Sequence, residues 1–149
     1  MDSQALVRLC NGNQEAMDWL QLCRYYCHEI DDLVDETIPQ ADKSGGIDRV
    51  CRIGALALKL YTHPFFLKHL DALSAVMMLN TINYRDSCHA EASTIPWAQN
   101  FSDWARHGGI DVSLVVGEIC GGYERTVGES MALRHVAYQL HHDAKGNAT

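Results

Sequence analysis

A long helical pattern over residues 14–38 most constrains how this chain can fold. Its apolar side chains recur every three or four residues, at Trp19, Leu22, Cys23, Tyr26, Ile30, Leu33 and Thr37. This spacing places them on one side of an α-helix, and that side has to be buried against other elements. Asn13 is a suitable N-cap for the helix, and Pro39 ends it because proline cannot continue the helical hydrogen bonds.

Helical periodicity also dominates the rest of the chain, and the alternation typical of strands is found nowhere in it. We predict helices over residues 3–11, 14–38, 47–61, 64–92, 96–106 and 113–140, with a polar loop over 40–46. These elements predict an all-α fold, a single-domain helical bundle of about four long and two short helices. We expect the domain to span residues 1–149, with a frayed tail over residues 141–149.

Charge and cysteine usage limit the partners of the chain. Its 149 residues carry a net charge of −7 and no cluster of Lys and Arg, so we expect no nucleic-acid partner. We also expect no membrane partner, because no apolar run approaches about 18 residues and the N-terminus lacks a signal peptide. The 6 cysteines form no C-x-x-C pair and lie mostly within apolar helical patterns. We therefore expect a cytoplasmic protein with reduced thiols.

An acidic run closes the 14–38 helix. Its carboxylates are Glu29, Asp31, Asp32, Asp35 and Glu36. On a helix, Glu29, Asp32 and Glu36 border the apolar side, whereas Asp31 and Asp35 turn towards solvent. Like charges spaced i,i+4 destabilise a helix, so such a run has either a bound cation or a well solvated side. The sequence leaves both interpretations open.

A polar row lies in the later half of the 64–92 helix. Its inner side is apolar as far as Met77 and then carries Asn80, Asn83, Tyr84, Ser87, Cys88 and Glu91. A polar group that is buried without a partner costs about 1–3 kcal/mol, so these side chains need hydrogen bonds. Either they line a polar pocket at the bundle end where the acidic helix also ends, or this half of the helix faces water.

The last predicted helix carries Glu118 on its predicted inward side, close to Gly117 and Gly121. A glycine inside a helix costs about 1 kcal/mol relative to alanine, which indicates close helix packing or space for a ligand. Glu118 is therefore a further candidate metal ligand, and the alternative is a supporting or exposed position.

Two motifs resemble those of class I isoprenoid synthases. Asp31-Asp32-Leu33-Val34-Asp35 resembles their D-D-x-x-D motif, and Asn83-x-x-x-Ser87-x-x-x-Glu91 resembles the second metal motif of the terpene cyclases among them. The resemblance implies helices whose acids bind magnesium and, through it, a diphosphate. This chain is much shorter than the family's, its motifs lie closer together, and Tyr84 stands where the family usually has Asp. The likeness therefore concerns the chemistry of the site.

A second resemblance covers more of the chain. The run from Gly12-Asn13 to Asp35, with Gly121-Gly122-Tyr123-Glu124, is similar to small proteins of tailed-phage genomes that carry such an acidic helix. It implies a cytoplasmic phage accessory protein and no catalytic residue.

Together these patterns predict a metal-dependent protein that binds or hydrolyses a phosphorylated small molecule, such as a nucleotide or a diphosphate ester. The predicted ligands of Mg²⁺ or Mn²⁺ are Glu29, Asp31, Asp32, Asp35, Glu36 and Glu118. Asn83, Ser87 and Glu91 would complete the metal shell or position water, as in a phosphohydrolase or pyrophosphatase. Two alternatives stay open: an interaction or anti-defence protein that binds a host protein through its acidic surface, and a virion assembly component that forms a homo-oligomer.

Overall fold

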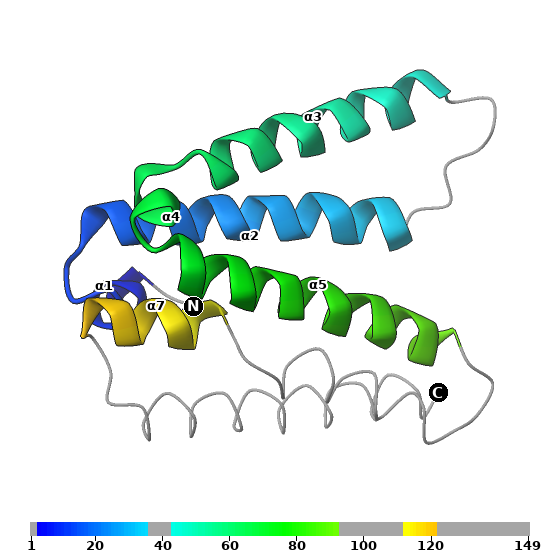
Figure 1. The fold of residues 1–149 in the computed structure, drawn as a ribbon. Coiled ribbons are helices and arrows are strands. Elements are labelled where there is room, and N and C mark those ends of the chain that lie inside the picture. The colour runs from blue at the N-terminus through cyan, green and yellow to red at the C-terminus, as the bar shows by residue number, and fades with distance from the viewer. Residues whose placement is uncertain (1–2, 36–42, 93–111, 122–149) are drawn as a thin grey trace. The chain divides into compact units, whose positions relative to one another are not determined.

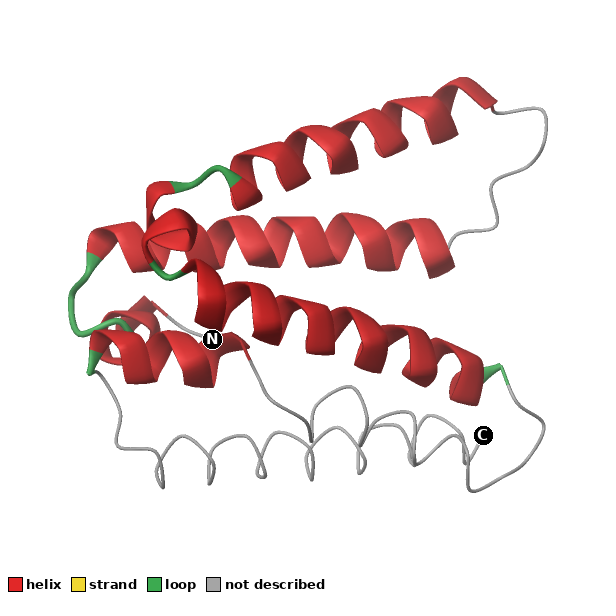
Figure 2. Cartoon of the chain, viewed as in Figure 1, coloured by secondary structure: helices red, strands yellow, loops and turns green. Residues whose placement is uncertain are grey.

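The fold is known from a computed structural model, which describes residues 3–35, 43–92 and 112–121. These residues form α-helices joined by short turns and contain no strand, as Figure 2 shows. The helices are α1 (Ser3–Leu9), α2 (Gln14–Asp35), α3 (Lys43–Tyr61), α4 (Pro64–Lys68), α5 (Leu70–Glu91) and α7 (Val112–Cys120). The prediction of an all-α fold is confirmed. No helix in the described ranges is long and apolar enough to cross a membrane.

The chain divides into two compact units. One unit is Asn13–Leu70, and the other combines Met1–Gly12 with Asp71–Thr149. In the Asn13–Leu70 unit, α3 runs alongside α2 and α4 contacts both helices (Figure 1). In the other unit, α1 packs against α7. The extent of a single domain over residues 1–149 stays a prediction.

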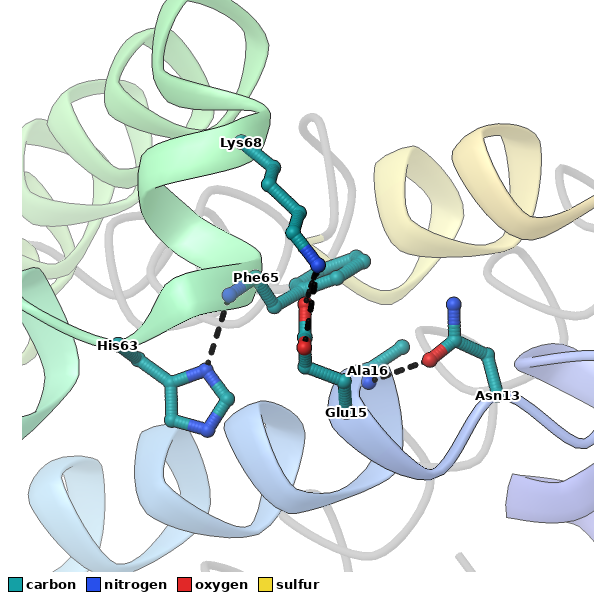
Figure 3. Close-up of polar contacts among 6 residues, drawn as sticks. All are labelled: Asn13, Glu15, Ala16, His63, Phe65 and Lys68. Carbon is teal, nitrogen blue, oxygen red and sulfur yellow. Dashed lines mark hydrogen bonds and ion pairs between the residues drawn. The ribbon is translucent and has the colours of Figure 1, made fainter.

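The chain passes from α1 to α2 through a turn that the sequence predicts at Asn11-Gly12. Both residues have positive φ, 50° at Asn11 and 74° at Gly12, a conformation that asparagine and glycine tolerate best. The Gly12 N–H donates to the carbonyl of Val7 at 3.0 Å and so closes the end of α1. The Asn13 side chain then accepts a hydrogen bond from the Ala16 N–H at 3.1 Å (Figure 3), which confirms Asn13 as the cap of α2.

Trp19 of α2 lies at the centre of the Asn13–Leu70 unit and is fully buried. Its ring lies 5.9 Å from that of Phe65 and 6.0 Å from that of Phe66, both on α4. Its indole Nε1–H donates to the carbonyl of Leu60 on α3 at 3.0 Å, so the buried donor is satisfied. One side chain therefore joins the three helices of the unit.

The start of α4 positions the two phenylalanines. Pro64 occupies the first turn, where its missing N–H has no intrahelical role. The His63 side chain caps the helix through Nδ1, which accepts from the Phe65 N–H at 3.2 Å (Figure 3). Lys68 at the other end of α4 forms an ion pair with Glu15 in the first turn of α2 at 3.0 Å. These contacts fix the angle at which α4 meets α2.

Three predicted helix boundaries are wrong. The 64–92 helix is broken at His69, whose ψ of 37° is not helical, so that α4 and α5 are separate. The apolar spacing continues in register across this break, and periodicity therefore does not reveal it. Residues 43–46 belong to α3 instead of the predicted loop, because Gly45 and Gly46 weaken a helix without forbidding it.

The last predicted helix is interrupted at Gly121. α7 stops at Cys120, and Gly121 has a φ of 69°, the left-handed conformation common just after a helix. The predicted helix over 96–106, the 122–140 part of the last helix and the tail over 141–149 lie outside the described residues.

Candidate functional site

Glu29 is the predicted metal ligand whose surroundings are best described. Its Oε2 lies 3.7 Å from Nε of Arg49 and 3.6 Å from Nη2 of Arg52, both on α3. These distances are too long for hydrogen bonds, and Oε2 accepts none, but they suffice for charge neutralisation. Two guanidinium groups therefore supply positive charge beside Glu29.

The other acids of α2 differ from the predicted order. Asp32 is exposed and Asp31 is half-buried, although Asp32 was expected to border the core and Asp31 to face solvent. The prediction took the buried side from the apolar stripe alone, whereas burial near a helix end depends on which neighbours reach it. Asp35 is the last residue of α2, and Glu36 lies outside the described residues.

The described part of the chain contains no group of three or more His, Cys, Asp or Glu side chains that could hold a metal ion. The donors it does describe do not fit a magnesium site, because Glu29 is neutralised by arginines and Asp32 is exposed to solvent outside any such group. A site for Mg²⁺ or Mn²⁺ that includes Asp35 or Glu36 stays a prediction.

The polar row of α5 lies on a buried side. Ser87 is fully buried, and Asn80, Asn83 and Tyr84 are half-buried, so the alternative in which this half of the helix faces water is wrong at Ser87. The Ser87 hydroxyl donates to the carbonyl of Tyr84 at 2.9 Å, a bond within its own helix. Glu91 is the last residue of α5. Because α5 and α2 belong to different units, a joint site of their polar rows stays a prediction.

Glu118 does not occupy the predicted inward position, because its side chain is exposed on α7. The neighbouring Gly117 is buried, and a Cβ added there would come within 2.8 Å of Cδ1 of Leu9 on α1. The Asn11 side chain also donates to the carbonyl of Cys120 at 3.3 Å. The glycine at position 117 therefore serves the close approach of α1 to α7 and not a ligand.

Several thiols have surroundings that suppress their reactivity. Burial raises the pKa of Cys10 to about 11, and the neighbouring thiol of Cys120 adds to the effect. Burial also raises the pKa of Cys23 and of Cys27, with the Asp31 carboxylate contributing at Cys27. A thiolate is the reactive form of cysteine, so these residues are poor nucleophiles at neutral pH.

α3 carries an exposed apolar surface that was not predicted from its sequence. Ile47, Val50 and Leu58 are 61%, 53% and 68% exposed. Together with exposed smaller residues they follow the spacing of one helical side, which we call the outer α3 face: Ile47, Val50, Cys51, Gly54, Ala55 and Leu58. The signal was present in the sequence, because apolar and small residues recur at this helical spacing from residue 47 to residue 58.

Charged residues border the outer α3 face along one edge. Asp48, Arg52 and Lys59 are exposed and spaced four and seven residues apart, so they lie on one line along the helix. α3 carries four basic residues and one acid, whereas α2 carries six acids and one base. The two helices attract each other on their inner sides, and the basic character of α3 extends to the edge of its outer face.

Comparisons with known proteins do not identify the chain. No protein-family model, no curated protein and no solved structure matches it. The resemblances to isoprenoid synthases and to small phage proteins stay predictions from short motifs.

Proposed function

We propose that this protein is a helical protein-interaction module whose docking surface is the outer α3 face. The observation that carries the proposal is the exposure of Ile47, Val50 and Leu58, each more than half accessible to solvent on one side of one helix. Contiguous exposed apolar surface on a soluble protein usually marks a site of association. The proposal keeps the non-enzymatic alternative of the sequence analysis and moves its surface from the acids of α2 to α3.

The inner side of α3 supports this role by holding the helix in place. Leu60 is fully buried, and its carbonyl accepts the indole hydrogen bond of Trp19. Arg49 and Arg52 reach Glu29 on α2 farther along the helix. A docking helix that is already fixed loses little conformational freedom when a partner binds, and this favours affinity.

The test uses two properties of the outer face in dilute protein. Cys51 should react with a maleimide, as mapped by peptide mass spectrometry, while the fully buried Cys10 stays unmodified. An apolar dye such as anilinonaphthalene sulfonate should bind the native protein, and Leu58→Lys should reduce its fluorescence. Ala72→Lys adds the same charge at an exposed position of α5 and should leave the fluorescence unchanged. A Cys51 that stays unreactive at the lowest concentration would refute the proposal.

A second candidate function is the predicted metal-dependent chemistry on a phosphorylated small molecule. The support for it is the row of acids in the last turns of α2, where Asp32 is exposed, and the buried polar side of α5 around Ser87. Its weakness is the neutralisation of Glu29 by two arginines. Titration of Mg²⁺ and Mn²⁺ into the wild type and Asp32→Ala by calorimetry separates the candidates. Absence of binding heat and of thermal stabilisation in the wild type would sink the metal function.

A further inference from the structure

Gly54 lies near the centre of the outer α3 face, in the interior of a helix. A Cβ added at this position would meet no atom within 4 Å, so no close packing inside the described chain requires a glycine there. Glycine in a helix interior is nevertheless unfavourable relative to alanine. The centre of the face carries small residues, Cys51, Gly54 and Ala55. Larger residues, Ile47, Val50 and Leu58, lie towards its two ends, so the face is shallow at its centre. A second helix can approach closely at such a centre.

We propose that the outer α3 face binds the α3 of a second copy of this chain, antiparallel to it across a two-fold axis near Gly54. This inference rests on the proposed function and names its partner. A two-fold interface is the commonest form of self-association, and it requires a surface that is complementary to itself. In this arrangement Leu58 of one copy packs beside Ile47 and Val50 of the other, and each shallow centre faces the other.

The charged edge of α3 selects the antiparallel direction. Asp48 and Lys59 are eleven residues apart, which is about three helical turns, so both lie on the same edge of the face. Gly54 lies close to their midpoint. The two-fold axis brings both charged edges to the same side, where Asp48 of each copy meets the partner's Lys59. A parallel two-fold pair would instead place the two charged edges on opposite sides of the interface, where Asp48 and Lys59 of the two copies do not meet and the attraction is lost.

The size of the face predicts a weak and reversible dimer. A stable interface buries about 1,200–2,000 Å² in total, whereas the outer α3 face is one side of only about three helical turns, over residues 47–58. The charge pairs lie at the exposed edge, where they determine direction and register more than strength. We therefore expect self-association that depends on protein concentration.

The first experiment measures the mass of the full chain by sedimentation equilibrium over a wide range of concentrations. The apparent mass should rise from the 16.7 kDa of one chain towards twice that value, and Cys51 should react more slowly with maleimide as the dimer forms. Gly54→Lys places like charges at the two-fold axis and should raise the dissociation constant at least about tenfold. Ala72→Lys is the matched control and should leave it unchanged.

A charge-swap experiment tests the direction of pairing. Lys59→Glu sets an acid against Asp48 of the other copy and should weaken the dimer, and the double variant Asp48→Lys with Lys59→Glu should restore it. Circular dichroism should show that both variants keep the helical content of the wild type, because both positions are exposed.

The outcomes separate this inference from the proposed function. A protein that stays monomeric at all concentrations with a reactive Cys51 overturns the self-pairing and leaves the docking face available to another protein. A dimer that is insensitive to Gly54→Lys, or a double variant that is not restored, also overturns the self-pairing. A monomer whose Cys51 is unreactive overturns the proposed function as well.

Discussion

Leu58 and Leu60 are the same residue type, two positions apart on α3, and they have opposite roles. Leu60 is fully buried beneath Trp19, whereas Leu58 is 68% exposed. The inner side of α3 is bound to α2 and α4 by apolar packing, a buried hydrogen bond and ion pairs. The outer side has apolar residues of the same kind without these contacts. The difference shows that apolar residues on α3 stabilise the fold on one side and are exposed to solvent on the other.

The largest loss of stability is expected for Trp19→Ala, which removes the side chain that packs on the inner side of α3. The change deletes the contacts with Phe65 and Phe66 and leaves the Leu60 carbonyl without its donor. Replacing a buried aromatic side chain by alanine costs about 3–5 kcal/mol. Urea unfolding followed by circular dichroism should show this loss of stability. A loss below about 1 kcal/mol would mean that Trp19 does not join the three helices.

The comparison itself is tested by Leu60→Ala and Leu58→Ala, which make the same change on the two sides. Leu60→Ala should lower the free energy of unfolding by about 2–5 kcal/mol because it leaves a cavity. Leu58→Ala should change it by less than about 0.5 kcal/mol at concentrations where the protein is monomeric. Equal losses in urea unfolding would show that the outer face is covered and would contradict the distinction between the two sides.

Cys10 extends the comparison to a buried thiol. Its pKa is raised from 9.0 to about 11 in the folded protein, so its thiol form stabilises the fold fully below pH 9. This contribution is lost as the pH rises from about 9 through 11, because the unfolded chain then releases the proton first. The loss should amount to at most about 3 kcal/mol, because one pKa unit corresponds to about 1.4 kcal/mol. Cys10→Ala should flatten the stability curve over this pH range, as measured by urea unfolding at a series of pH values.

Gly54→Ala separates the stability of the helix from association. Alanine stabilises a helix interior by about 0.5–1 kcal/mol relative to glycine, and nothing within 4 Å would obstruct the added Cβ. The isolated chain should therefore unfold at a higher urea concentration than the wild type. A destabilised monomer would mean that an unseen neighbour already occupies the space beside Gly54.

Local features of the fold were predictable from the sequence, and contacts between distant residues were not. The Asn13 cap and the stripe around Trp19 and Cys23 are local, and the structure confirms them. The break at His69 was missed because the apolar spacing continues through it. At Gly117 the sequence left close packing and a ligand as alternatives. The residue that requires a glycine there is Leu9, which is far away in the chain.

The candidate site was even less predictable from the sequence, because it depends on contacts between different helices. The pattern of α3 could not reveal which of its two apolar sides faces inward, because a helical wheel contains no information about neighbouring helices. The acids of α2 suggested a metal ion because no Lys or Arg lies among them in the sequence. The arginines that pair with Glu29, Arg49 and Arg52, lie on α3, beyond a predicted loop. Recognising this pairing requires knowledge of how α2 and α3 lie against each other, which periodicity does not provide.

The smallest effect is expected for Glu29→Gln, and it decides between two roles of the acidic helix. The Glu29 side chain is 28% exposed and that of Arg52 is 53% exposed, so solvent screens their attraction. The variant should lose only about 0.2–1 kcal/mol in urea unfolding, and the loss should diminish as salt is added. A metal ligand would behave differently, because Mg²⁺ would stabilise the wild type and not the variant. If Mg²⁺ changes the stability of the wild type and of the variant equally, Glu29 acts as the ion-pair partner of the inner side of α3. Its charge then helps to hold in place the helix that carries the outer α3 face.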